Sequence, residues 1–409
     1  MPWRAQSLPM TKDVLIAGGG LGGLAAALAC ARIGRQAHLY EQARVFSEVG
    51  AGIQLGPNTT RILASWGLDA ALRRVAAFPR MLRVRGAGDG AELACMRLGT
   101  TFTDRYGAPY ATIHRADLQG LLLDAAQSHG VDLRLAARVR SAWQTAEAAG
   151  LHVEGETDFH GEALIGADGL WSIVRQQVCS DGLPPPTGHV AYRGLAAQAD
   201  LPETLRTQEV TVWLAPHLHV VAYPVRGGDE LNVVAIIEGQ GIGPAEDWDQ
   251  EALAVNLQTT LAGACMPLRD LVRAMPGWRL WALHDRRPTR RAADMARGRI
   301  ALLGDAAHPM RPYLAQGAGM AIEDAEALAR SLATVGGAID IPAALSTYAQ
   351  ARWQRCARVQ RRSQRNGQIF HAVGAVRWGR DLALRALGER IVDLPWLYGA
   401  TGTSIGRST

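Results

Sequence analysis

The sequence predicts an α/β protein in which a discontinuous Rossmann-like domain is interrupted by a β-rich domain and followed by a C-terminal helical segment. Three observations support this fold class. A glycine-rich turn joins a short apolar strand to an alanine-rich helix near the N-terminus, two later apolar strands end in glycine and aspartate, and residues 190–237 are strand-like and rich in turns. The length of 409 residues allows two or three domains of about 150 residues each.

The first elements are a strand over Asp13–Ala17, a helix over 22–34 and a second strand over 37–41. This order and spacing are typical of a right-handed βαβ unit with parallel strands. Residues 14–31 carry no charge, so they could be mistaken for a signal peptide or a membrane segment. Asp13 directly before this stretch and the glycine cluster within it favour a phosphate-binding turn instead, and we expect no membrane insertion.

The glycine turn has the pattern G-x-G-x-x-G. Its first glycine permits a tight turn, its second lets the backbone approach a pyrophosphate, and its third allows close packing of helix on strand. The helix start offers free N–H groups to phosphates, and an acid ending the second strand is placed to bind a ribose. A glycine-rich packing turn is the alternative, and the motif does not distinguish NAD from FAD. The residues expected around the dinucleotide are Gly18, Gly20, Leu21, Gly22, Gly23 and Glu41.

The remaining elements follow from periodicity and turn residues. We expect helices over 57–66, 115–128, 318–332 and 342–370, and paired strands over 80–85 and 92–96. Alternation over 138–166 predicts antiparallel strands, residues 181–186 form a linker, residues 285–297 form a polar loop, and 299–304 is a buried strand.

Composition excludes several classes of function. Lys12 is the only lysine, which excludes a Walker-A site and a Schiff-base lysine, and the five cysteines form no C-x-x-C pair. We therefore expect a reduced, cytoplasmic protein without a metal site. The net charge of +5 does not indicate a nucleic-acid binder. An arginine stripe at helical spacing is expected to be a solvated face whose stems cover apolar surface, rather than an anion-binding patch; it comprises Arg352, Arg355, Arg358, Arg362 and Arg365.

Two further segments, ALIGADGLWSIVR at 163–175 and RIALLGDAAHP at 299–309, each run from an apolar strand into a glycine–aspartate corner. With the glycine turn, they resemble the class A flavoprotein monooxygenases of the para-hydroxybenzoate hydroxylase fold. Within that family the chain is similar to the salicylate, 3-hydroxybenzoate and 6-hydroxynicotinate hydroxylases. We expect an FAD-binding domain over 10–79, 97–180 and 285–340, a substrate-binding β-sheet domain over 80–96 and 181–284, and a helical region over 341–409.

The resemblance implies further FAD contacts. Asp168 matches an aspartate linked to both FAD and reduced-nicotinamide binding, and Asp305 matches one that binds the ribityl chain. Arg115 matches an arginine that touches the flavin, and the helix start at Gly317 and Ala318 would lie beside the flavin ring. Arg44 and Val139 complete the expected cofactor residues. A helix N-cap is the alternative role for both aspartates.

Two residues of the β-rich domain are candidate catalytic groups. His219 and Tyr223 are four residues apart, so on a strand they face the same side. The pair resembles the one that handles the substrate hydroxyl proton in the 3-hydroxybenzoate and 6-hydroxynicotinate hydroxylases. The alternative is a buried histidine and a packed tyrosine with structural partners. The expected substrate-binding residues are Gln54, Tyr223, Pro312 and Tyr313.

The resemblance implies an FAD-dependent monooxygenase that uses NAD(P)H and O₂ to hydroxylate a small hydroxylated aromatic or N-heteroaromatic acid through a flavin C4a-hydroperoxide. We expect no nucleic-acid partner and a monomer or homodimer. Gln54 and Pro312 differ from the residues of the 6-hydroxynicotinate and 3-hydroxybenzoate relatives, respectively, so the substrate stays open. Two alternatives are an oxygenase of a larger polyketide, quinone or drug-like ring, and a non-catalytic FAD-binding protein.

Overall fold

The computed structural model describes residues 13–46, 52–239, 250–252, 254–336 and 340–399. One of its two large sheets has six strands, in the order β18-β19-β11-β1-β2-β7. Neighbouring strands are parallel, except that β18 runs antiparallel to β19. The strands of this sheet are β1 (Asp13–Ala17), β2 (Gln36–Tyr40), β7 (Asp132–Arg134), β11 (Ala163–Gly166), β18 (Ala296–Arg297) and β19 (Ile300–Leu302).

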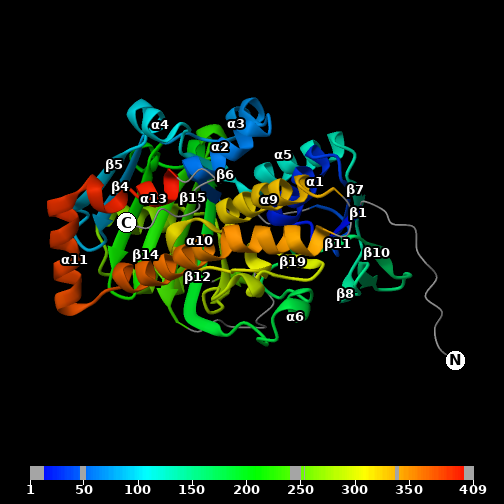
Figure 1. Cartoon of the computed structure of the whole chain (residues 1–409). Coiled ribbons are helices and arrows are strands. Elements are labelled where there is room, and N and C mark those ends of the chain that lie inside the picture. Colours follow the sequence, from blue (N-terminus) through cyan, green and yellow to red (C-terminus); the bar gives the residue numbers. More distant parts are fainter. Residues whose placement is uncertain (1–12, 47–51, 240–249, 253, 337–339, 400–409) are drawn as a thin grey trace.

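Three long helices pack beside this sheet: α1 (Leu21–Arg32), α5 (Arg115–Ser128) and α9 (Gly317–Ala333). Helix α1 contacts both α5 and α9, and the main hydrophobic core lies where these helices meet β1, β11 and β19. The α1 helix is alanine-rich because nearly all of it, including residues 23–30, is buried between neighbours. Figure 1 shows this layered half of the molecule on the right.

An eight-stranded sheet forms the other half, in the order β16-β17-β12-β15-β14-β13-β4-β5. Parallel pairing of β13 with β4 inserts the early hairpin beside strands that follow more than 100 residues later in the chain. The strands are β4 (Met81–Gly86), β5 (Glu92–Arg97), β12 (Pro186–Ala197), β13 (Val210–Ala215), β14 (Leu218–Val225), β15 (Glu230–Glu238), β16 (Gln250–Ala252) and β17 (Trp278–His284).

The two faces of this sheet have different neighbours. One face packs on α7 (Ala254–Thr260) and α8 (Met266–Ala274) through a second hydrophobic cluster. On β14 the residues Leu218, Val220 and Ala222 belong to that cluster, so the alternating residues face the opposite side.

Helix α10 (Ile341–Phe370) runs across the molecule and contacts α9, β18 and β19 along its length.

Smaller elements complete the fold. The strands β8 (Val139–Gln144), β9 (Ala149–Val153) and β10 (Phe159–Gly161) form one sheet, and β3 (Gly52–Leu55) pairs with β6 (Ala111–His114). The other helices are α2 (Pro57–Ser65), α3 (Asp69–Val75), α4 (Thr100–Tyr106), α6 (Arg175–Val178), α11 (Gly374–Leu387), α12 (Glu389–Val392) and α13 (Pro395–Tyr398).

The expected elements agree closely with these bounds, with one correction. The alternation over 138–166 predicts only antiparallel strands, but β11 at its end pairs in parallel with both β1 and β19. Every residue of β11 is buried, as is usual for the centre of a parallel sheet covered on both faces. No helix in the described segments is long and apolar enough to cross a membrane.

Candidate active site

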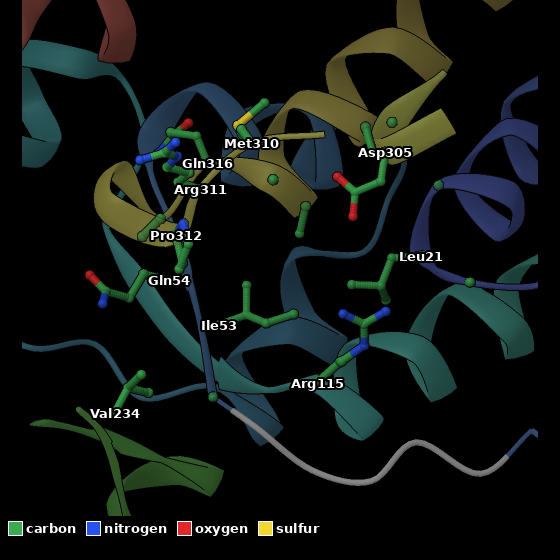
Figure 2. A pocket seen from close by; sticks show the side chains of 18 of the residues that line it. Leu21, Ile53, Gln54, Arg115, Val234, Asp305, Met310, Arg311, Pro312 and Gln316 are labelled. Carbon is green, nitrogen blue, oxygen red and sulfur yellow. The ribbon is translucent and has the colours of Figure 1, made fainter. Parts of the chain in front are cut away.

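A cavity of about 300 Å³ lies between the six-stranded and eight-stranded sheets. Figure 2 shows Leu21, Arg115 and Asp305 on one side of it, Gln54 and Pro312 on the other, and Ile53 between them. The first group comes from helix starts and strand ends of the parallel sheet, where ligands bind in open α/β folds. The cavity therefore has a nucleotide end and a second end that belongs to the β-rich half.

The glycine turn forms the nucleotide end. Gly18 has a φ of +102°, and a Cβ on Gly23 would lie 1.8 Å from the carbonyl oxygen of Gly18. A Cβ on Gly20, by contrast, would have no protein atom within 4 Å, and Gly20, Leu21 and Gly22 line the cavity. The first and third glycines therefore serve packing, while the second leaves open backbone where a pyrophosphate can approach.

Glu41 follows the end of β2, beside this turn. One carboxylate oxygen accepts a hydrogen bond from the N–H of Gly19 at 2.6 Å, and the other accepts one from the N–H of Ala43 at 2.8 Å. A carboxylate has about four acceptor positions, so these two bonds leave capacity for a ribose hydroxyl. The placement fits the expected role without testing it.

Asp305 lies three residues after the end of β19, in a 3₁₀ turn over Gly304–Ala306, and its carboxylate points into the cavity (Figure 2). The dense protein surroundings raise the pKa of this carboxyl, while His308 and Arg115 act to lower it. Helix α9 begins at Gly317, and Gly317 and Ala318 also line the cavity. A Cβ on Gly317 would meet no protein atom within 4 Å, so backbone N–H groups and a positive helix end are accessible there.

Asp168 is turned away from the cavity. Its carboxylate accepts hydrogen bonds from the Ser172 hydroxyl at 2.5 Å and from the N–H groups of Ile173 and Val174 at 2.8 and 3.1 Å. These bonds hold the loop that precedes α6, and Val174 is the N-cap of that helix, so Asp168 is not its N-cap. The neighbouring Gly169 lines the cavity instead, so Asp168 shapes the wall indirectly.

Arg44 and Val139 do not line this cavity. Arg44 is exposed after β2, and Val139 begins β8 in the three-stranded sheet. Their assignment to the cofactor stays a prediction.

The second end of the cavity is mostly apolar. His219, Val221 and Tyr223 of β14 all line it, as expected for residues two and four apart on a strand. Val234, Ile236, Trp281 and Met310 add apolar surface. Such a wall suits a planar ring and excludes water from it.

His219 is 1% exposed, and its Nδ1 lies 2.9 Å from Nε2 of His371. Burial, with His371 and His189 nearby, lowers the pKa of His219 well below its usual value. The imidazole is therefore neutral at pH 7, and its Nε2 is the ring nitrogen not engaged by His371. A neutral buried imidazole in a cavity wall can accept a proton from a bound hydroxyl.

Tyr223 and Gln54 form a polar group beside it. The Tyr110 hydroxyl donates to Gln54 Oε1 at 2.6 Å, and a side-chain hydrogen bond links Gln54 with Tyr223. Burial raises the pKa of Tyr223, so its hydroxyl stays protonated and able to donate. Both residues line the cavity.

Pro312 lines the cavity, but Tyr313 does not. The Tyr313 hydroxyl lies 2.9 Å from Nδ1 of His189, and its ring centroid is 5.2 Å from that of His219. The 3₁₀ turn over Pro312–Leu314 directs successive side chains to different sides. Tyr313 therefore supports the histidines behind the cavity wall rather than the wall itself.

The sequence reasoning missed three polar residues here. Arg193 of β12 lines the cavity with its guanidinium 3.4 Å from the Trp281 ring centroid, and Arg311 lines it while paired with Asp285 at 3.0 Å. His371 reaches His219 from the end of α10. Arg311 lies two residues after the glycine–aspartate segment, which was a usable signal, but Arg193 and His371 come from segments without a motif.

The fold and the cavity define a dinucleotide-binding protein with a ring-sized apolar compartment beside the cofactor end. The family profile described as "FAD binding domain" matches residues 11–363. The chain belongs to this family and binds FAD. The open backbone at Gly20 and Gly317 and the inward carboxylate of Asp305 fit that cofactor.

Characterised relatives span nearly the whole chain. A 3-hydroxybenzoate 6-hydroxylase from Polaromonas naphthalenivorans is 38% identical and aligns over 96% of each chain. A 6-hydroxynicotinate 3-monooxygenase from Bordetella bronchiseptica is 36% identical over 86% of this chain and 91% of its own.

Among solved structures, a salicylate hydroxylase substrate complex has 26% identity and a TM-score of 0.81, with 97% of both chains covered. Klebsiella pneumoniae HpxO complexed with FAD and uric acid has 25% identity and a TM-score of 0.82, covering 93% of this chain and 94% of its own. These likenesses confirm the expected fold class and family.

Proposed function

We propose that this FAD-dependent monooxygenase hydroxylates a small hydroxylated aromatic or N-heteroaromatic acid, with NAD(P)H and O₂ as co-substrates. The observation that carries the proposal is one cavity in which the FAD end adjoins an apolar compartment holding His219, Tyr223 and Arg193. The relatives named above act on hydroxylated benzoates and nicotinates, which have the ring size and groups that this compartment suits.

FAD, when bound, supplies the electron transfer and oxygen activation that no side chain can supply. The chain's own residues would hold it: the open turn at Gly20 would receive the pyrophosphate, and Asp305 and Arg115, which line the same cavity, would contact the part nearer the ring. The start of α9 offers N–H groups and a positive helix end to negative charge on the ring system. Glu41, Arg44 and Val139 are proposed for the adenosine end.

His219 is the proposed base. A phenolate ring is more electron-rich than a phenol ring, so removing the hydroxyl proton favours attack on an electrophilic oxygen. His219 is neutral and Tyr223 is protonated, so the first can accept that proton while the second donates a hydrogen bond to the phenolate oxygen. Gln54 orients Tyr223, and Pro312 limits the space above the ring.

Arg193 is the proposed partner of the substrate carboxylate. It lies on β12 and its stacking on Trp281 fixes the guanidinium plane. Its charge lowers the pKa of Tyr223 against the larger raising effect of burial, which places it close to that residue. A planar guanidinium matches a carboxylate with two parallel hydrogen bonds.

The remaining partners follow from the same proposal. NAD(P)H and O₂ come from solution, and the protein works as a monomer or homodimer. A cytoplasmic location would supply NAD(P)H, and it agrees with five cysteines that form no disulfide.

The test is a panel of 3-hydroxybenzoate, salicylate, 6-hydroxynicotinate, 3-amino-4-hydroxybenzoate and urate, each added to FAD-loaded protein with NADH or NADPH. Substrate-dependent NAD(P)H oxidation with a hydroxylated product of a monocyclic acid is the expected result. Phenol serves as the control without a carboxylate, and Arg193→Gln should raise KM for the acid while leaving phenol unaffected. Turnover of urate alone, or of no compound, contradicts the proposal.

A further inference from the structure

A series of ring nitrogens and carboxylate oxygens leads from the cavity wall to the surface. His219 is 1% exposed and contacts His371, which is 4% exposed, through Nδ1 and Nε2 at 2.9 Å. On the far side of its ring, His371 Nδ1 lies 3.5 Å from Oε1 of Glu238, an ion-pair distance longer than the two neighbouring contacts, so the ring or the carboxylate must move closer for a proton to pass. The other oxygen of Glu238 lies 2.6 Å from Nδ1 of His217.

Exposure rises along this series. The Glu238 side chain is 41% exposed and that of His217 is 62% exposed. The four residues therefore join a compartment closed to water with a carboxylate and an imidazole that exchange protons with solvent. The hydroxylase function gives none of the three outer residues a role, since they stand behind His219 and not in the cavity wall.

Backbone hydrogen bonds fix the outer members of the series. The N–H of His217 donates to the carbonyl of His371 at 3.1 Å, and the N–H of Glu238 donates to the carbonyl of His217 at 2.9 Å. The β13–β14 turn, the end of β15 and the end of α10 are thus tied together at this point. These bonds hold the backbones of His217, Glu238 and His371 next to one another, which keeps their side chains close together.

The protonation states suit proton transfer. Burial, together with His189 and His217, lowers the pKa of His371 to about 4 against the opposing effect of Glu238. Burial and then Arg311 lower the pKa of His189. Both rings are neutral at pH 7, and a neutral imidazole accepts at one nitrogen while it donates from the other.

The groups that face the series from neighbouring elements are few. The ring of His189 on β12 lies tilted against that of His371 with centroids 5.2 Å apart, and His189 also contacts the Tyr313 hydroxyl. Phe370 covers His219 from the end of α10, at 5.2 Å between ring centroids. Arg311 is paired with Asp285 and acts on the series through its charge.

We propose that His219, His371, Glu238 and His217 form a relay that carries the substrate hydroxyl proton from the cavity to solvent. This inference rests on the proposed function and extends it beyond the cavity wall. His371, Glu238 and His217 are relay residues that act through His219.

The transfer balances without a further reactant. The substrate O–H bond breaks as an N–H bond forms at His219 Nε2. The N–H bond at His219 Nδ1 then breaks as one forms at His371 Nε2, and the proton on His371 Nδ1 passes to the Glu238 carboxylate. Glu238 releases it to water directly or through His217. One proton leaves the hydroxyl, one enters solvent, and each ring ends neutral in its other tautomer.

The experiment measures proton release after stopped-flow mixing of FAD-loaded enzyme with 3-hydroxybenzoate, in weak buffer with a pH indicator dye. Flavin absorbance follows binding in the same mixing. We expect His371→Gln to slow proton release by about 10- to 100-fold with FAD content and ligand affinity unchanged, because the relay is cut inside the protein. Added buffer should not restore this variant.

Glu238→Gln and His217→Gln test the surface end, where folding is not at risk. Each should slow release in weak buffer and recover in concentrated imidazole buffer, which can take the proton at the surface. His189→Gln is the matched control, because His189 contacts His371 from outside the path, and this variant should release protons at the wild-type rate.

Three outcomes overturn the relay: a wild-type rate in His371→Gln, equal slowing in His189→Gln, or no buffer effect on Glu238→Gln. Failure of the proposed function differs from these, because the wild-type flavin spectrum would then not respond to 3-hydroxybenzoate or any other acid of the panel. In that case both the proposed function and the relay are wrong.

Discussion

Gly20 and Gly23 are three residues apart in one turn, yet their surroundings are opposite. A Cβ at position 20 would point into the open cavity, while one at position 23 would strike the carbonyl oxygen of Gly18. These surroundings agree with the different roles expected from the sequence, since each glycine of this motif has its own geometric reason, and the pyrophosphate contact of Gly20 stays a prediction. The first residue-scale prediction separates the two roles experimentally.

Gly20→Ala should leave the unfolding of the FAD-free protein almost unchanged and weaken FAD binding, since its methyl group occupies pyrophosphate space. Gly23→Ala should destabilise the FAD-free protein by about 1–3 kcal/mol, since backbone must move to admit the methyl group. Urea unfolding of FAD-free protein and FAD titration measure the two effects. Equal loss of stability in both variants would contradict this assignment.

The direction in which a side chain points could not be predicted from the sequence. Asp168 and Asp305 both follow a parallel strand and a glycine, but Asp168 accepts hydrogen bonds from the loop before α6 while Asp305 faces the cavity. Tyr313 likewise turns toward His189 although its neighbour Pro312 lines the cavity. These differences depend on the local turn and on packing partners, which the spacing of residues does not contain.

At the scale of elements, the α9–α10 pair differs from its sequence expectation. The arginine stripe on α10 was expected to be a solvated face, but Arg352 is buried and pairs with Glu323 and Asp324 of α9 at 2.8 and 2.7 Å. Arg355 also pairs with Glu323, at 2.6 Å. The expectation was wrong for these two residues, because the acids that match them lie on a helix 30 residues earlier.

This network supports the cofactor end. Burial alone would raise the pKa of Asp324, but His308 and Arg352 outweigh it and lower the pKa to about 2. The same carboxylate accepts a hydrogen bond from the N–H of Gly304, next to Asp305. Helix α10 thus holds the corner that presents Asp305 to the cavity.

Arg352→Leu should therefore lower the free energy of unfolding by about 3–5 kcal/mol, because it leaves two buried carboxylates short of a partner. It should also weaken FAD retention through the corner at Gly304. The matched control is Arg365→Leu on the exposed side of the same helix, which should change stability by less than about 0.5 kcal/mol. Urea unfolding of both variants checks the difference; a similar small change in each would refute the role of the network.

For the whole molecule, sequence patterns predicted the kinds of element better than their arrangement. The strands of the eight-stranded sheet come from 81–97 and 186–284, and their composition marked both stretches as strand-forming. The parallel pairing of β4 with β13 joins two segments that are far apart in the sequence, and the periodicity of a strand does not indicate which strand it pairs with. The same is true of His371, which joins His189 and His219 only after α10 has crossed the molecule.

That histidine cluster gives the molecule a pH-dependent stability. The folded chain lowers the pKa values of His189, His219 and His371, the last to about 4, so the unfolded chain binds more protons as pH falls from about 6.5 toward 4. The free energy of unfolding must then fall over this window. His308 acts in the opposite direction: Asp324 raises its pKa against the effect of burial, so its contribution is complete below about 6.5 and is lost at higher pH.

These groups together predict maximal stability near pH 6.5, with a decline on both sides. The His371 shift from 6.5 to about 4 corresponds to about 3 kcal/mol of the acid decline, since one pKa unit equals about 1.4 kcal/mol. Urea unfolding of the FAD-saturated protein at pH 4.5–8.5 measures the profile, and His371→Gln should flatten its acid side while preserving the alkaline side. An acid decline of equal slope in His371→Gln would show that His371 does not contribute to it.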